Sequence, residues 1–222
     1  WGANEYGELG DGVRPLRSSP ARVPGAAAVT SLAAGGQHTL ALRSDGTLLS
    51  WGSNGLGQLG DGTQVSRSTP GPVSAIADVR GIAAGDFHSM AVKNDGSLWA
   101  WGYNYQGLLG LGDQEARPLP TSVPGLPPIA AVALGENHSL ALGRDGTVWA
   151  FGANVTGQLG DGTTTDRFTP VQVAGLTGIT AVAGGGSHSL ALRSDGTVGS
   201  WGRNYSGELG DGTNVDRLRP VP

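Results

Sequence analysis

Short apolar runs alternate with glycine-rich polar segments along the whole chain, and no stretch shows the 3.6-residue period of a helix. Residues 29–34 and 38–43 form two such runs, each rich in small and β-branched residues. Asp45-Gly46 separates the second run from residues 48–51, and Asp-Gly between two such runs is typical of a β-hairpin with a type I′ turn. Residues 70–73 contain two prolines, which cannot donate to a β-ladder and therefore predict an edge strand. We name these four predicted strands A, B, C and D in chain order.

The same pattern returns every 50 residues without slippage. The segment Trp51-Gly52-Ser53-Asn54 has counterparts that begin at Trp1, Trp101, Phe151 and Trp201. A fixed period of this length indicates one supersecondary unit stacked on itself, as in a repeat array or a propeller. Because each repeat contains four antiparallel strands, the pattern predicts an all-β fold built from the blades of a β-propeller. The aromatic residues of strand C are expected to fill the space between neighbouring blades.

The period divides the chain into one propeller domain with four complete blades, at residues 26–75, 76–125, 126–175 and 176–222. Residues 1–25 add the C–D half of a preceding blade. The chain has no further A–B half to complete it, so we expect an open arc or a fragment of a larger ring. The start at Trp1, inside a repeat, also indicates a fragment. Apolar blade faces at the ends of an arc predict self-association through exposed blade edges.

One repeat resembles a known family closely. Residues 33–42, Asp45-Gly46-Thr47, and the segment that begins Trp51-Gly52-Ser53-Asn54 are similar to the repeat of the regulator of chromosome condensation family. The resemblance covers essentially the whole chain and implies a β-propeller, usually of seven blades. Members of the family include nucleotide-exchange factors for small GTPases and bacterial inhibitors of secreted enzymes. The exchange factors engage the GTPase through insertions in particular blades, and the regular 50-residue register here has no room for one.

Composition narrows the class of partner. A net charge of −4 disfavours a broad electrostatic interaction with nucleic acid or an anionic membrane, and no apolar run approaches the roughly 20 residues that span a bilayer. The chain has no cysteine, so disulfides and thiolate metal sites are excluded. We therefore predict a protein or peptide partner, and neither a nucleic acid nor a membrane.

The four histidines raise the question of a metal site, because imidazole is a common metal ligand. His38, His88, His138 and His188 occupy one position in successive repeats, with no second ligand at short spacing. We expect each to be buried and hydrogen-bonded to backbone, and we predict neither a metal nor a cofactor. Gly60-Asp61-Gly62 and its counterparts resemble pieces of calcium loops but lack the alternating oxygen ligands, so we interpret them as Asx turns. The recurring arginines (Arg17, Arg67, Arg117, Arg167 and Arg217) and asparagines (Asn4, Asn54, Asn104, Asn154 and Asn204) are interpreted as structural.

No sequence motif supports catalysis. The chain has no nucleophile elbow, zinc-protease motif or phosphate loop. His88 and Ser89 are adjacent on a strand, so their side chains face opposite ways, which argues against a nucleophile–base contact. We predict that the protein is not an enzyme and has no catalytic residues.

Recognition is expected where the repeats differ. In an antiparallel blade the A–B and C–D connections emerge at one end, and the B–C and D–A connections at the other. The B–C turns are nearly identical, whereas the A–B and C–D connections vary and contain all four tyrosines. Tyrosine is typical of recognition surfaces. The candidate partner-binding residues are Tyr6, Phe87, Tyr103, Tyr105, Glu136, Asn137, Arg203 and Tyr205.

Other interpretations stay open at this point. The tyrosines could shield blade edges, and the chain could be a purely structural or engineered repeat array that self-assembles. A small-GTPase nucleotide-exchange factor or a secreted-enzyme inhibitor is less favoured by the regular register.

Overall fold

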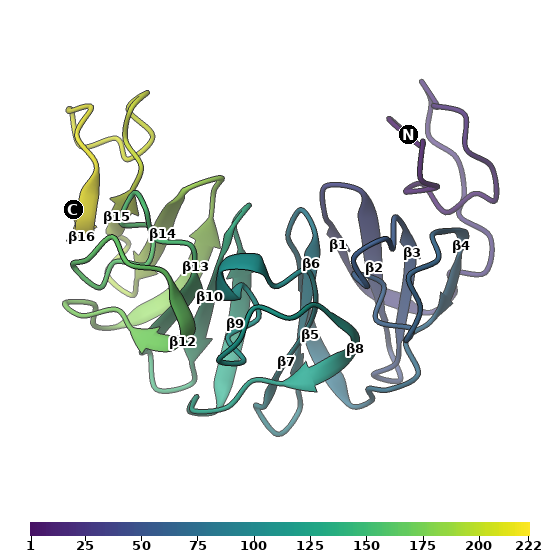
Figure 1. Cartoon of the computed structure of the whole chain (residues 1–222), viewed down its shortest axis with the longest axis horizontal. Helices are drawn as coiled ribbons and strands as arrows, with labels where there is room; N and C mark the ends of the chain where they lie inside the picture. Colours follow the sequence, from purple (N-terminus) through teal and green to yellow (C-terminus); the bar gives the residue numbers. More distant parts are fainter. The chain divides into compact units, whose positions relative to one another are not determined.

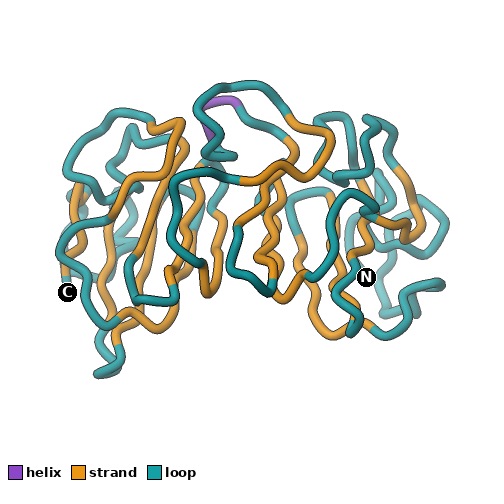
Figure 2. The backbone as a smooth tube through the Cα atoms, turned by 90° about the horizontal axis from the view of Figure 1, so that it is seen from below, coloured by secondary structure: helices purple, strands orange, loops and turns teal.

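The computed structural model describes all 222 residues, and strands account for nearly all of the regular structure (Figures 1 and 2). The first sheet contains β1 (Val29–Ala34), β2 (His38–Arg43), β3 (Leu48–Gly52) and β4 (Arg67–Pro72), and the second contains β5 (Val79–Ala84), β6 (His88–Lys93), β7 (Leu98–Gly102) and β8 (Arg117–Ser122). The third contains β9 (Ile129–Leu134), β10 (His138–Gly143), β11 (Val148–Gly152) and β12 (Arg167–Gln172), and the fourth contains β13 (Ile179–Gly184), β14 (His188–Arg193), β15 (Val198–Gly202) and β16 (Arg217–Val221). The predicted all-β fold of four-stranded blades is confirmed.

The only helical element is a single 3₁₀ turn, η1 (Tyr105–Gly107). It has neither the length nor the apolar sequence that crossing a lipid bilayer requires.

The chain forms two compact units that are discontinuous in sequence. The N-terminal unit comprises Trp1–Asn94, Trp99–Tyr103 and Glu115–Ser122. The C-terminal unit comprises Asp95–Leu98, Asn104–Gln114 and Val123–Pro222. The first sheet lies within the N-terminal unit and the third and fourth within the C-terminal unit. Asn104–Gln114, the central part of the C–D connection of the second sheet, also belongs to the C-terminal unit.

Within each sheet the strands follow sequence order, so strands A and D are the two edges. The B–C hairpin pairs His38 with Gly52 and continues to Leu42 opposite Leu48. Its turn is not the predicted type I′, because Gly46 has a positive φ of 78° and Asp45 does not, and the Arg43 amide donates to the Thr47 carbonyl oxygen across a three-residue loop. Strand D begins earlier than predicted, at Arg67 instead of Pro70, because Arg67 pairs with Gly52 before a bulge in the ladder. Both prolines of this strand lie on the edge, as expected.

The aromatic residues of strand C pack between consecutive blades, as predicted. Trp101 is fully buried in one cluster with Leu40 and Leu42 of the preceding blade. In the C-terminal unit, Trp201 occupies the same position against Leu140 and Leu142. Glycine completes the contact: a Cβ built on Gly60 would lie 2.7 Å from Trp101 Nε1, inside contact distance.

Residues 1–25 contain a single isolated bridge, between Gly2 and Arg17. Val23 packs against the cluster of Ala41, Leu49 and Trp51, and the Trp51 indole donates to the carbonyl oxygen of Glu8 (2.8 Å). This segment therefore covers the face of the first sheet that the preceding blade covers elsewhere in the chain.

Candidate partner-binding surface

The C–D connections are rigid, because one buried asparagine organises each of them. Asn54 Oδ1 accepts from the amide of Leu59 (2.9 Å), and its Nδ2 donates to the carbonyl oxygens of Thr63 (3.1 Å) and Val65 (3.3 Å). Asn154 and Asn204 make the same set of bonds. A long loop tied at several points by one side chain can present other side chains in a defined geometry.

An aspartate and an arginine close the same loops. Asp61 accepts from the amide and hydroxyl of Thr63 and forms an ion pair with Arg67 (3.1 Å). Burial alone would raise the pKa of Asp61, but the hydrogen bonds from Thr63 and the charge of Arg67 hold it below the usual value. The pairs Asp161–Arg167 (2.7 Å) and Asp211–Arg217 (2.8 Å) repeat the arrangement. These contacts support the structural interpretation of the Gly-Asp-Gly segments.

The C–D connection of the second sheet departs from this pattern. Leu111 stands where the other repeats have aspartate, and Asn104 donates instead to Asp113 Oδ1 (3.0 Å). Arg117 pairs with Glu115 (3.6 Å). The η1 turn lies in this connection and holds Gln106 at a φ of 67°, in the left-handed region that non-glycine residues rarely adopt. The loop that presents Tyr105 therefore differs in backbone from its counterparts.

The histidines are structural in a way that was not predicted. His38 Nε2 lies 2.8 Å from the hydroxyl of Ser89 in the next blade, so its partner is a side chain instead of backbone. The Ser89 hydroxyl donates to the carbonyl oxygen of Gln58 (2.9 Å). Because that hydroxyl has a single proton, it must accept from His38, which places the imidazole proton on Nε2. His188 is only half-buried, in contrast to the other three histidines.

The sequence excluded a contact only between a histidine and a serine that are adjacent on one strand. The contacting pair is 51 residues apart and joins two blades, so it was not predicted. The pair lies within hydrogen-bond distance but is not arranged as a nucleophile and its base, because both side chains are buried and the serine hydroxyl donates to a carbonyl oxygen instead of to the histidine.

The predicted partner-binding residues fall into two groups. Tyr105 and Tyr205 are 58% and 76% exposed, and Glu136 and Arg203 are also exposed. Tyr6, Phe87, Tyr103 and Asn137 are half-buried. The structure brings Phe87 and Tyr103 together in an edge-to-face contact, with ring centroids 6.3 Å apart.

Arg203 and Tyr205 line one groove of about 720 Å³ in the C-terminal unit. Its other lining residues are Thr156, Asn214, Val215 and Asp216. These four residues were not predicted from the sequence. No two repeats have the same triplet at the position of 214–216, so this segment varies as the positions of the tyrosines do, but it lies at the far end of the C–D connection, just before strand D.

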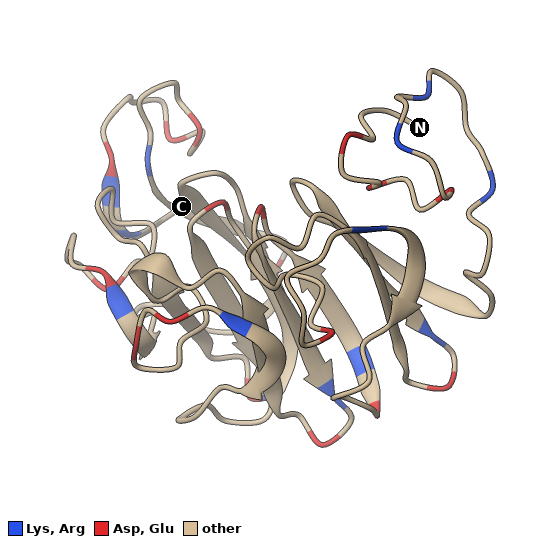
Figure 3. Cartoon of the chain, turned by 45° about the vertical axis from the view of Figure 1, so that its right-hand side comes forward, with Lys and Arg blue, Asp and Glu red and all other residues tan.

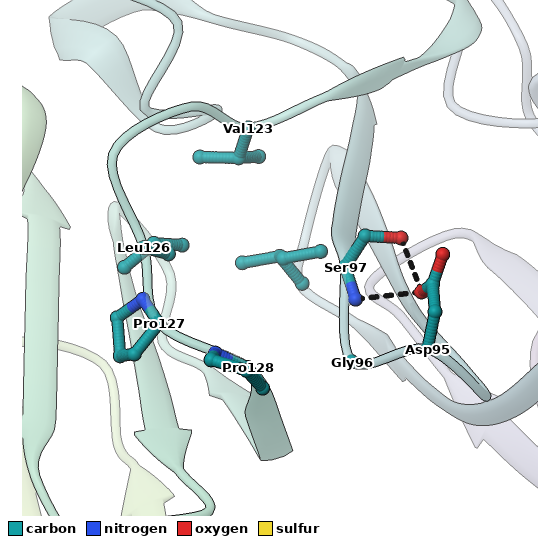
Figure 4. A pocket seen from close by; sticks show the side chains of 8 residues that line it. Asp95, Gly96, Ser97, Val123, Leu126, Pro127 and Pro128 are labelled. Atoms are coloured by element: carbon teal, nitrogen blue, oxygen red, sulfur yellow. Dashed lines mark hydrogen bonds between the residues drawn. The ribbon is translucent and has the colours of Figure 1, made fainter.

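A smaller pocket of about 310 Å³ lies at the opposite end of the blades, between a B–C turn and a D–A connection (Figure 4). Leu126, Pro127 and Pro128 form one wall, and Asp95 and Ser97 the other, where Asp95 Oδ1 accepts from the amide (2.8 Å) and hydroxyl (2.7 Å) of Ser97. The polar groups of this pocket therefore satisfy one another, which leaves little to orient a ligand.

Protein-family models match most of the chain. The model of the regulator of chromosome condensation (RCC1) repeat matches residues 1–42, 45–92, 95–142 and 145–192. The chain belongs to the RCC1 repeat family. A second model of the same repeat matches residues 29–58, 79–108, 129–158 and 179–208. A search of curated proteins found no match.

Solved structures of RCC1 proteins are similar throughout the chain. Prp20p from Saccharomyces cerevisiae is 30% identical over 100% of this chain and 58% of its own, with a TM-score of 0.83. Yeast RCC1 (Prp20) bound to Kap60 is 26% identical over 96% and 52%, with a TM-score of 0.84. Human WBSCR16 is 25% identical over 98% and 60%, with a TM-score of 0.84. This chain therefore spans between half and three fifths of the length of these relatives.

Proposed function

We propose that this chain is a non-enzymatic interaction scaffold that binds a protein or peptide through its A–B and C–D connections. The observation that carries the proposal is the exposure of Tyr105 and Tyr205 on connections that buried asparagines hold rigid. A large aromatic ring on a rigid loop gives contact area at a low entropic cost on binding.

The relatives support a protein partner. The published description of the Prp20p structure names its binding to Gsp1p and histones, and another yeast RCC1 structure is a complex with Kap60. Because this chain spans only part of those proteins, we infer from them that its partner is a protein, and we do not infer which protein it is.

The polar groups that recur among the repeats already form contacts within the fold, which supports a binding role over catalysis. His38 and His138 each contact a serine of the next blade, and Asp61 is occupied by Thr63, Asn54 and Arg67. The groups that remain accessible in the connections include the rings of Tyr105 and Tyr205, the carboxylate of Glu136 and the guanidinium of Arg203.

Site-specific photocrosslinking tests the proposal. A benzophenone amino acid at position 205 or 105 should yield crosslinks to the same partner polypeptide in cells that produce the protein. Position 194, an exposed serine in the B–C turn of the fourth sheet, is the matched control and should not crosslink to it. Crosslinks from 194 alone, or equal crosslinking from all three positions, would contradict binding through the A–B and C–D connections.

A further inference from the structure

The connections of the C-terminal unit carry a surplus of carboxylates (Figure 3). Its A–B and C–D connections contain seven acidic residues and one basic residue, Arg203, and two further arginines, Arg167 and Arg217, begin the strands that follow. All three basic residues are already in ion pairs: Arg167 with Asp161 (2.7 Å), Arg203 with Glu208 (3.4 Å) and Arg217 with Asp211 (2.8 Å). Glu136, Asp166 and Asp216 form no ion pair. No cationic side chain of this chain therefore neutralises these three carboxylates.

One of these carboxylates lies in the groove with Tyr205. Asp216 Oδ1 accepts from the backbone amide of Asn204 (2.7 Å), which holds the side chain in place and leaves Oδ2 without a hydrogen bond. Tyr205 and Val215, which are 76% and 60% exposed, supply apolar surface beside it. The backbone carbonyl of Tyr205 accepts from Asn214 Nδ2 (3.0 Å), so the two segments that form the groove are tied together.

We propose that this groove binds a lysine or arginine side chain of a partner polypeptide. The cationic head meets the free oxygen of Asp216, and the aliphatic stem packs on the Tyr205 ring and Val215. Long basic side chains combine an apolar stem with a charged head, and an aromatic face attracts a cation. This inference rests on the proposed function and adds the chemical class that the groove selects.

Arg203 also lines the groove and could instead attract an acidic partner. Its Nε faces Glu208 Oε1 at 3.4 Å, and Glu208 Oε2 accepts from the amide of Ser206 (2.8 Å), so the carboxylate that neutralises Arg203 is itself held in place. The charge of Arg203 is therefore balanced inside the loop, whereas that of Asp216 is not. This difference favours a basic ligand.

The preceding blade provides an internal control. Asp166 accepts from the amide of Asn154 (2.8 Å) as Asp216 does from Asn204, and it also lacks an ion pair. Ala153, Val155 and Thr165 replace Arg203, Tyr205 and Val215 there. Asp166 therefore has the carboxylate and its anchoring bond without the aromatic wall.

The test uses two acetylated, amidated heptapeptides that differ only at the centre, Gly-Gly-Leu-Lys-Leu-Gly-Gly and the same peptide with Glu in place of Lys. Amide chemical shifts of the full chain are followed during titration. The lysine peptide should shift the resonances of residues 203–206 and 214–216 and bind more tightly than the glutamate peptide. Asp216→Asn keeps the bond to Asn204 and should weaken binding about tenfold, as expected for loss of one charge-assisted contact. Asp166→Asn should leave the affinity within about twofold of wild type.

Arg203→Ala separates the two ligand classes. If the groove takes a cation, this variant binds the lysine peptide at least as well as wild type. Preferential binding of the glutamate peptide, abolished by Arg203→Ala, would overturn the inference, as would equal effects of Asp216→Asn and Asp166→Asn or no shift at millimolar lysine peptide. If photocrosslinks from position 205 persist in that case, the scaffold function stands and only the ligand class is wrong.

Discussion

His38 Nε2 and Ser89 Oγ lie 2.8 Å apart, and this bond joins two consecutive blades. Ser89 donates onward to the carbonyl oxygen of Gln58, which also accepts from the Trp101 indole (2.9 Å). His138, Ser189, Gln158 and Trp201 repeat the arrangement in the C-terminal unit with the same distances to within 0.1 Å. At these two junctions one carbonyl oxygen thus binds two donors of the next blade, which explains why histidine, serine and tryptophan recur together.

Removing the central hydroxyl should destabilise the junction. Ser89→Ala leaves the buried Nε2–H of His38 without an acceptor and removes one donor from Gln58, so we expect a loss of about 1–3 kcal/mol in the free energy of unfolding. Urea denaturation measures it. Ser194→Ala, at an exposed turn, is the control and should change stability by less than about 0.5 kcal/mol. Equal stability of Ser89→Ala and wild type would show that the junction does not depend on this bond.

The buried histidines should make the protein acid-sensitive. Burial lowers the pKa of His38 to about 4, and burial with the neighbouring His188 lowers that of His138 to about 4. The unfolded chain binds protons near pH 6.5, so the stability from the neutral imidazoles is complete above that pH and is lost as the pH falls towards 4. Each group should account for about 3 kcal/mol of this loss.

The experiment for this prediction is urea denaturation at several pH values between 7 and 4. His38→Gln keeps an N–H donor for Ser89 but cannot titrate, so its stability should fall less steeply over this range. The aspartates with lowered pKa, such as Asp61, also cost stability as the pH falls, but in a lower window, below their unfolded value near 4. A histidine variant with an unchanged pH profile would refute the assignment.

Much of the fold was predictable from sequence because the signals are local. The Asp45-Gly46 turn and the apolar run after it specify a hairpin whatever lies elsewhere in the chain, and the 50-residue period multiplies this information. The His38–Ser89 bond was not predictable in the same way, because it links position 38 of one repeat to position 39 of the next. Only the stacking of blades brings them together.

The candidate site likewise has some residues that the sequence predicts and others that only the structure reveals. The tyrosines could be selected because their position in variable connections is visible in the sequence. Asp216 could not, since a carboxylate before a strand has the same appearance in sequence whether it closes a turn, as Asp211 does, or remains unpaired. The half-burial of Tyr103 depends on its contact with Phe87 on another connection.

The residue before strand A offers a test of backbone strain. Ala28 and Asp78 adopt φ values of 55° and 59°, and Gly178 holds the same position at 63°. A left-handed conformation costs a non-glycine residue about 1–2 kcal/mol. Ala28→Gly should therefore raise the free energy of unfolding by about 0.5–1 kcal/mol after the entropy of the added glycine is included, and Gly178→Ala should lower it by about 1 kcal/mol. Denaturant melts of both variants should show these opposite signs, and changes of the same sign would contradict the strain argument.

The third repeat lacks one bond that the others make, and it should be possible to restore it. Phe151 stands where the other blades have tryptophan and has no N–H to donate, so the carbonyl oxygen of Leu108 accepts from Ser139 (2.8 Å) without a second donor. Gly110 faces the Phe151 ring as Gly60 faces Trp101, so the space beside the ring is formed by the same residue type.

Phe151→Trp should therefore add an indole bond to Leu108 and raise the free energy of unfolding by about 0.5–1.5 kcal/mol. Trp201→Phe, which removes the bond to Gln158 in the preceding blade, should lower it by a similar amount. Urea denaturation of the two single variants and the double variant checks both signs, and destabilisation by Phe151→Trp would show that overpacking at this junction outweighs the added hydrogen bond.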